Sequence, residues 1–170
     1  IRVTDQHTSL SNTQLVLHPP VLALGVGCER GCDLDEVYKL VKKTISYAGL
    51  SKQSIACVTS IDVKSDEKAV LALAEKLGVP ARFFSASELE ALTPRLKTPS
   101  DVVFAEVGCH GVSEGAALAA GGVDAELIVP KTKSARVTCA IARSPKDINA
   151  KTVGRARGKL TIVGIGPGAS

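Results

Sequence analysis

Short apolar runs alternate with amphipathic stretches along most of the chain. The run 21–27 is continuous, small and bounded by glycine, which is typical of a buried parallel strand. Two further short runs, 55–60 and 81–84, are also expected to be strands. Between them, at 33–49 and 66–77, apolar residues recur at helical spacing. This alternation of strands and helices predicts parallel crossover connections and an α/β sheet.

Two of the expected helix starts carry capping residues. Asp33 is followed three residues later by Glu36, and Ser85 is followed in the same way by Glu88. This spacing is that of a capping box, in which the two side chains satisfy each other's backbone amides. We therefore expect a helix to begin at each of these positions.

The second half of the chain predicts two helices and a hairpin. The segment 100–107 fits a helix or a strand, and we favour the helix because Ser100 can cap it. The segment 112–120 is rich in alanine and reads as a helix, and 126–129 and 137–142 are strands joined by a short polar turn. The expected fold is a three-layer α/β/α sandwich whose mostly parallel sheet of about five strands ends in this hairpin.

Polar stretches flank this unit, which spans 20–142. Residues 1–19 end in His-Pro-Pro and predict a linker from a preceding domain, and 143–158 predict a second, basic linker. Residues 159–170 read as the first strand and glycine-rich loop of a further domain that is cut off. Because the chain also contains no methionine, we expect an internal segment of a longer polypeptide.

Composition narrows the choice of partners. The chain has 170 residues, of which 45% are hydrophobic and 22% charged, and lacks an apolar run long enough to cross a membrane. A net charge of +4 favours anionic ligands, whereas three Phe, two Tyr and no Trp leave little to stack on nucleic-acid bases. Five cysteines, an odd number, fit reduced thiols and a cytoplasmic location. We expect neither a nucleic acid nor a membrane as partner.

The loop GVGCERGC at 25–32 is the most distinctive stretch. Gly25, Gly27 and Gly31 give a spacing one residue longer than the dinucleotide fingerprint, and no G-K-[ST] follows, which excludes a P-loop. A glycine loop between a strand and a helix still offers backbone amides to an anion, and Arg30 adds charge. The loop is therefore either a ligand contact or only a tight turn.

The cysteines raise the alternative of a metal site. Cys28 and Cys32 would have to converge with Cys109 and His110, and C-x3-C is not a familiar zinc spacing. Small buried thiols are common in protein cores. We expect no metal bound by the protein.

Other candidates lie at the expected carboxyl end of the second strand and in the hairpin turn. Ser60, Asp62 and Lys64 follow that strand, at the edge where open α/β sheets bind ligands, although capping or solvation also explains them. Lys131 and Lys133 crowd the turn, which is either a solvated basic turn or an anion contact.

The stretch VGCHGVSEG contributes a further group. Gly111 precedes a helix start and Glu114 lies in its first turn, where the helix dipole alone favours a carboxylate. His110 is a candidate base or an ordinary loop residue. No reaction follows from these residues alone.

Five motifs in this order resemble a known family. GVGCERG, TSIDVKSDEKAVLALAEKLGVP, FFSASELEAL, VGCHGVSEGAALAAG and LIVPKTKSARVTCAIA are similar to the CobE/CbiG C-terminal domain family of cobalamin biosynthesis, over about 17–142. LVLHPP is similar to the hinge before this domain in cobalt-precorrin-5A hydrolases. GKLTIVGIGPG resembles the start of a tetrapyrrole methylase, most closely a precorrin-3B methyltransferase. The resemblance thus implies a hydrolase–methyltransferase fusion with both of these portions as partners.

The resemblance implies an activity on corrin precursors. In the hydrolases, water opens the δ-lactone of cobalt-precorrin-5A and a two-carbon unit leaves as acetaldehyde. Glu114 is the first candidate base, followed by Asp62 and His110. The cobalt would be carried by the substrate, no cofactor would be bound by this domain, and S-adenosylmethionine would serve only the missing methyltransferase. The alternative is a corrinoid-binding or carrier module without catalysis.

A macrocycle fringed with carboxylates needs donors around its rim. The residues expected to bind it are Gly25, Gly27, Cys28, Arg30, Gly31, Ser60, Lys64, Gly111, Lys131 and Lys133.

Overall fold

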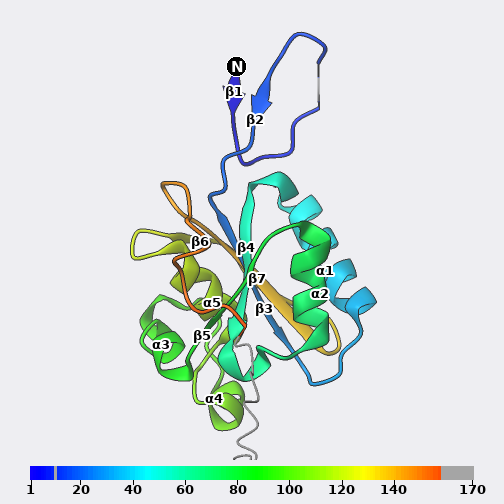
Figure 1. The fold of residues 1–170 in the computed structure, drawn as a ribbon. Helices are drawn as coiled ribbons and strands as arrows, with labels where there is room; N and C mark the ends of the chain where they lie inside the picture. Colours follow the sequence, from blue (N-terminus) through cyan, green and yellow to red (C-terminus); the bar gives the residue numbers. More distant parts are fainter. Residues whose placement is uncertain (10, 158–170) are drawn as a thin grey trace, which may run out of the picture.

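The computed structural model describes residues 1–9 and 11–157 (Figure 1). Its centre is a five-stranded sheet of order β5-β4-β3-β7-β6. β3, β4 and β5 pair in parallel, and β7 pairs antiparallel with both β3 and β6. The strands are β3 (Leu22–Cys28), β4 (Ile55–Ile61), β5 (Ala81–Phe84), β6 (Glu126–Lys133) and β7 (Val137–Arg143). The predicted parallel sheet with a terminal hairpin is confirmed.

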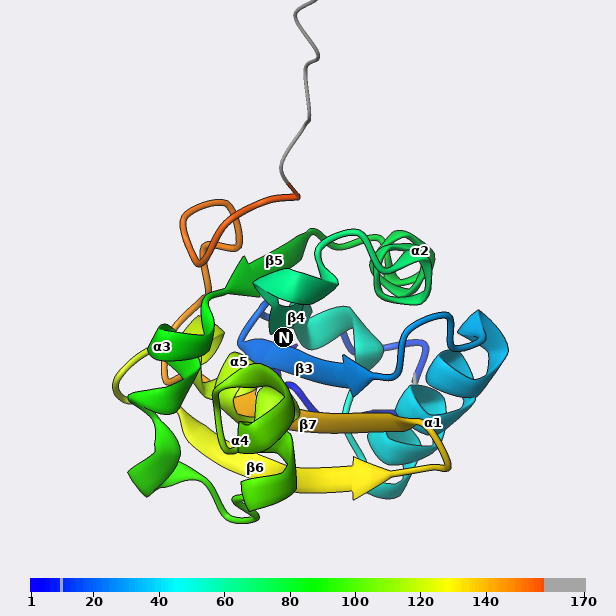
Figure 2. The same ribbon diagram turned by 90° about the horizontal axis from the view of Figure 1, so that it is seen from below.

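Helices cover both faces of this sheet, as Figures 1 and 2 show. α1 and α2 pack on one face and α5, with α3 beside it, on the other. α4 lies at the end of the molecule opposite the N-terminal strands (Figure 1). The helices are α1 (Leu34–Tyr47), α2 (Lys68–Leu77), α3 (Ala86–Glu90), α4 (Asp101–Val107) and α5 (Val112–Gly121), with short 3-10 turns η1 (Lys52–Ser54), η2 (Asp62–Lys64) and η3 (Thr93–Arg95). The α/β/α sandwich expected from the sequence is therefore present.

The capping signals were right for one helix and half right for another. Ser85 and Glu88 form the complete capping box of α3. Asp33 caps α1 by accepting from the Asp35 amide, but Glu36 does not complete a box. Its carboxylate instead accepts hydrogen bonds from the β6–β7 turn, and so joins α1 to the hairpin. The helix over 100–107 is confirmed, with Ser100 as its cap.

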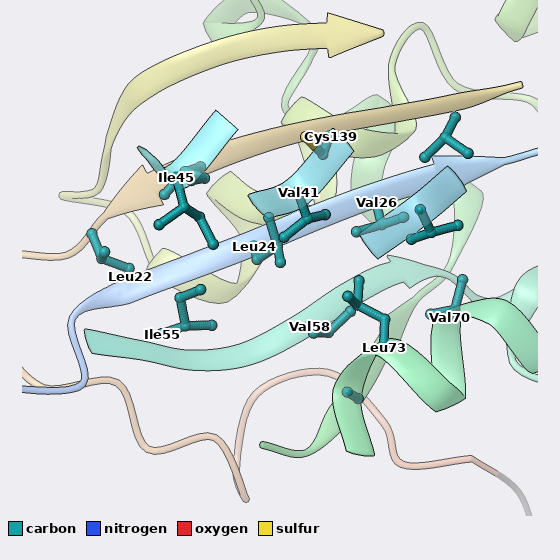
Figure 3. Close-up of a cluster of buried hydrophobic side chains, with 14 of the residues drawn as sticks. Leu22, Leu24, Val26, Val41, Ile45, Ile55, Val58, Val70, Leu73 and Cys139 are labelled. Carbon is teal, nitrogen blue, oxygen red and sulfur yellow. The ribbon is translucent and has the colours of Figure 1, made fainter. Parts of the chain in front are cut away.

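The side chains of β3 alternate between two different cores. Leu22, Leu24 and Val26 point to the face covered by α1 and α2, where they pack among branched aliphatic side chains (Figure 3). The positions between them are Ala23, Gly25 and Gly27, and Ala23 packs against the α5 side. The large residues thus build one core, and the small residues allow α5 to approach β3 closely.

The segments expected to be linkers make ordered contacts. Within 1–19, β1 (Arg2–Val3) and β2 (Val16–Leu17) form a small parallel ribbon, and Asp5 pairs with Arg143 at the end of β7. The described part of the second expected linker, 143–157, also packs on the domain: Ile148 is buried, and Arg155 forms an antiparallel bridge with Phe83 of β5. This second contact covers the open edge of β5, which would otherwise present unpaired backbone groups. The predicted domain start at 159–170 lies outside the described residues.

Within residues 1–9 and 11–157, none of the helices is long and apolar enough to cross a bilayer.

Candidate functional site

A cleft of about 450 Å³ opens where β3 and β4 end. Its walls are the loop after β3, the turn after β4, α4, the first turn of α5 and the β6–β7 turn. Carboxyl ends of neighbouring parallel strands are the usual ligand site of open α/β sheets. Most of the predicted ligand residues line this one cleft: Gly27, Cys28, Arg30, Lys64, Gly111, Lys131 and Lys133.

The cleft has an excess of positive charge. Its lining includes two carboxylates, from Glu29 and Glu106. The cationic residues outnumber them and come from three separate parts of the chain: Arg30, Lys64, Lys131, Lys133 and Arg136. Grouping cations in a concave surface raises the local concentration of anionic ligands. The site therefore suits a ligand with several carboxylates.

Some of these cations are held by neighbouring acids. Arg30 lies 2.6 Å from Asp66, and its hydrogen bond lowers the pKa of that carboxyl. Arg136 similarly pairs with Glu36 across 3.4 Å. Both pairs are substantially exposed and contribute little to stability, so they serve mainly to position the two guanidinium groups.

Lys64 and Lys133 differ from these two arginines. Within the part of the chain that the structure describes, neither lysine forms an ion pair. A cation without an acidic partner keeps its charge available for a ligand. These two lysines are therefore the main candidates for direct carboxylate contacts.

Glu114 does not have the geometry of a general base. Its side chain is 1% exposed, and its carboxylate accepts hydrogen bonds from the backbone amides of Lys97, Thr98 and Lys131 and from the Thr98 hydroxyl. Burial raises its pKa, but these hydrogen bonds outweigh burial and hold the pKa below its usual range. The catalytic role expected for Glu114 is corrected to a structural one: it ties the loop between η3 and α4, and also β6, to the first turn of α5.

His110 also lies outside the cleft lining. Its Nδ1 is 2.9 Å from the Glu90 carboxylate, its Nε2 is 3.4 Å from Asp101, and its ring stacks on Phe104 with centroids 4.5 Å apart. Because α4 has no buried residue of its own, these contacts attach that helix to the body of the domain. His110 thus acts as a support for a wall of the cleft, and the expected base role does not fit its position.

The remaining predicted residues lie around the cleft but do not line it. Asp62 is exposed on η2, and the buried Ser60 hydroxyl donates to the Val26 carbonyl across 2.7 Å. Gly31 has a φ of +71°, which suits glycine in a tight turn. Gly25 is buried beneath α5, where a side chain would overlap the Ser113 carbonyl. Ser60, Gly31 and Gly25 thus shape the backbone beside the cleft, whereas Asp62 lies outside its lining.

The thiols show no sign of activation. Burial raises the pKa of the Cys28 thiol to about 12, with further contributions from the neighbouring Cys32. A thiol with such a pKa stays protonated at neutral pH and is a poor nucleophile. Within the described ranges, no three His, Cys, Asp or Glu side chains converge as metal ligands do.

Sequence reasoning missed part of the α5 contribution to the site. Ser113 of α5 and Thr138 of β7 line the cleft together with Gly27, and neither was predicted. Gly111, which was predicted, serves as the N-cap of α5 without any side chain to cap its amides. Small residues at alternate positions of β3, opposite an alanine- and glycine-rich helix, were the available signal for this close approach.

The chain is thus an α/β domain with a basic cleft at the carboxyl ends of two parallel strands, and comparison with known proteins identifies its family. A family model described as "Cobalamin synthesis G C-terminus" matches residues 22–142. The match covers well over half of the chain, so the chain belongs to this family of cobalamin biosynthesis. The resemblance inferred from the five motifs is confirmed.

Two characterised relatives refine this assignment. The chain is 46% identical over 121 residues to Protein CobE from Sinorhizobium sp, covering 71% of this chain and 79% of that protein. It is 36% identical over 133 residues to cobalt-precorrin-5A hydrolase from Priestia megaterium, covering 78% of this chain. The matched region is 35% of the hydrolase, so the chain spans about a third of that enzyme.

Solved structures agree with the fold. A crystal structure of CobE, a protein from the cobalamin (vitamin B12) biosynthetic pathway, superposes with a TM-score of 0.68 at 35% identity, covering 78% of this chain and 95% of that one. A cobalamin biosynthesis protein from Agrobacterium tumefaciens gives 0.58 at 27% identity, covering 74% and 100%.

Proposed function

We propose that this domain binds a polycarboxylated corrin precursor, a cobalt-precorrin intermediate, in the basic cleft, and does so in the cytosol. The observation that carries the proposal is the convergence of cations from three parts of the chain on the carboxyl ends of β3 and β4. Small-molecule sites usually enclose about 300–1,000 Å³. The volume of this cleft would hold one edge of the macrocycle with its acid arms. Cobalt would enter as part of the substrate, without a cofactor of the domain.

A titration with cobyrinic acid, a stable polycarboxylated corrinoid, tests the proposal. We expect saturable one-to-one binding, which visible absorbance and calorimetry both measure. Lys64→Ala should weaken it about fivefold, since one charge-assisted contact at a partly exposed site is worth about 1 kcal/mol. Affinity should also fall as salt is raised, because salt screens these charges.

Lys43→Ala is the matched control. Lys43 is an exposed lysine of α1 that does not line the cleft, so this variant removes the same charge from the protein. An equal loss of affinity in both variants would mean that net charge, and not the cleft, attracts the ligand. An absence of binding by the unaltered chain at high micromolar concentration would overturn the proposal.

Lactone hydrolysis is a second candidate, favoured by the identity with the P. megaterium hydrolase. Such a reaction needs a base for water and donors for the oxyanion. The first-turn amides of α5 offer donors, and the carboxylates that line the cleft belong to Glu29 and Glu106. In this proposal the domain has two partners in one polypeptide, the preceding portion of a hydrolase and a following methyltransferase. Only the methyltransferase would use S-adenosylmethionine.

Release of acetaldehyde from cobalt-precorrin-5A separates the two candidates. If the chain binds corrinoid but releases no acetaldehyde, it is a binding or carrier module. If it releases acetaldehyde at a rate proportional to its concentration, the domain carries the hydrolytic machinery.

A further inference from the structure

We propose that the first turn of α5, together with the Ser113 hydroxyl, forms a subsite for a single carboxylate arm of the ligand. This inference rests on the proposed corrinoid-binding function and names the group that the cleft grips most directly. It assigns a binding role to Ser113, which lies between the loop after β3 and the β6–β7 hairpin.

The backbone amides at the start of α5 have no partner in the described structure. The N-cap is Gly111, which has no side chain to accept from them. Within residues 1–9 and 11–157, neither a side-chain nor a loop acceptor meets the amides of Val112 and Ser113. α5 is ten residues long, so its aligned peptide dipoles add partial positive charge at this end. A carboxylate oxygen is the kind of acceptor that such amides bind.

Ser113 supplies an independent indication of a ligand. It is 2% exposed, and it lines the cleft. Its hydroxyl makes no hydrogen bond in the described part of the chain. Unlike the Ser54 hydroxyl, which is fully buried without a partner, the Ser113 hydroxyl is not fully buried. A buried hydroxyl without a protein partner, bordering an open cleft, is arranged to donate to a bound acceptor.

The surroundings of this turn select a small, flat acceptor. A Cβ added at Gly27 would lie 2.7 Å from the Thr138 hydroxyl and 3.5 Å from the Val112 Cβ. On the other side, Glu114 holds the Lys131 backbone at 2.9 Å, which fixes the start of α5 relative to β6. The Lys131 and Lys64 side chains in the same cleft balance the charge of a carboxylate. Space at the amides is thus limited, while positive charge surrounds them.

Amide chemical shifts test the subsite directly. In ¹H–¹⁵N spectra of the full chain titrated with sodium propionate, the Val112 and Ser113 amides should shift and saturate, with sodium chloride as the ionic-strength control. Ser113→Ala should lower the affinity for cobyrinic acid about tenfold, because a hydrogen bond to a charged group is lost. A tenfold change in affinity corresponds to about 1.4 kcal/mol. Ser65→Ala removes a hydroxyl that does not line the cleft, and this variant should bind as the unaltered chain does.

The two probes separate failure of the subsite from failure of the function. If cobyrinic acid binds in a Lys64-dependent way but Ser113→Ala binds equally well and the α5 amides do not shift, the subsite is overturned and the function stands. If propionate shifts these amides but cobyrinic acid does not bind, the carboxylate subsite stands and the corrinoid function is overturned. If neither ligand acts on the domain, both are overturned.

Discussion

Glu114→Ala should be among the most destabilising single substitutions in this domain, lowering the free energy of unfolding by about 3–5 kcal/mol. The carboxylate accepts four hydrogen bonds at distances of 2.8–3.1 Å while almost fully enclosed. Alanine would leave three backbone amides without an acceptor, and each such buried group destabilises the fold. Urea unfolding monitored by circular dichroism measures the change as a shift of the midpoint at constant slope.

The same contact predicts a dependence on pH. The hydrogen bonds hold the pKa of Glu114 below that of an unfolded glutamate, against the opposing effect of its burial. A depressed carboxyl pKa contributes stability that is complete above the unfolded value, about 4.3, and is lost as the pH falls through the lower folded value. Glu114→Gln should therefore show a smaller loss of stability between neutral pH and pH 3 than the unaltered chain.

Glu106→Ala is the control for this prediction. Glu106 is an exposed carboxylate on α4, and its removal should change stability by less than about 0.5 kcal/mol. A loss below about 1 kcal/mol for Glu114→Ala would show that water replaces the carboxylate, and the structural role argued for it would be wrong.

The strands and helices were largely predictable because their signals are local. Short apolar runs located β3 and β4 to within one or two residues, and Ser85 with Glu88 located the start of α3. The flanking segments were not predictable in this way. The contact of Arg155 with the edge of β5 joins residues far apart in the sequence, and polar composition alone does not show it.

The chemical roles were harder to predict than the positions. Lys64 was expected at the sheet edge and Lys131 in the hairpin turn. Lys131 lies on β6 instead, but both side chains line the same cleft as the loop after β3. Glu114 and His110 were expected to be reactive because glutamate and histidine often are. Their hydrogen bonds come from loops and helices distant in sequence, so the sequence carries no sign that both side chains are already occupied.

Gly25 illustrates the same limit from the side of the backbone. Its place in a glycine-rich loop favoured a ligand contact, whereas its role depends on which face of β3 it occupies. The large residues Leu22, Leu24 and Val26 define one face, so Gly25 must lie on the other, under α5. Alternation of side chains along β3 therefore predicts the position of Gly25, once the small residues of α5 are recognised as the surface that packs against this face of the strand.

Gly25→Ala is accordingly the second substitution expected to have a large effect. An added Cβ would lie 1.8 Å from the Ser113 carbonyl oxygen and 2.9 Å from the Ala117 amide nitrogen, both of which belong to the backbone of α5. Backbone atoms cannot turn away as side chains do, so α5 must move off the sheet. We expect a loss of about 3 kcal/mol or more, at the upper end of the range for overpacked cores. Binding of cobyrinic acid should fall as well, because the first turn of α5 moves with the helix.

Two alanine substitutions make this prediction specific to the backbone clash. In Gly27→Ala the close neighbour is the Thr138 hydroxyl, a side-chain atom that can rotate, so the loss should stay below about 1.5 kcal/mol. In Gly115→Ala, on α5 itself, the new Cβ would lie 3.4 Å from Leu89, and the gain in helix propensity offsets that tight contact by up to about 1 kcal/mol. In thermal unfolding, the midpoint temperature of Gly25→Ala should be far below those of the other two variants. If Gly25→Ala and Gly27→Ala unfold at the same temperature, the position of α5 does not depend on the absence of a side chain at residue 25. The close helix–strand contact that shapes the cleft would then not be required for the fold.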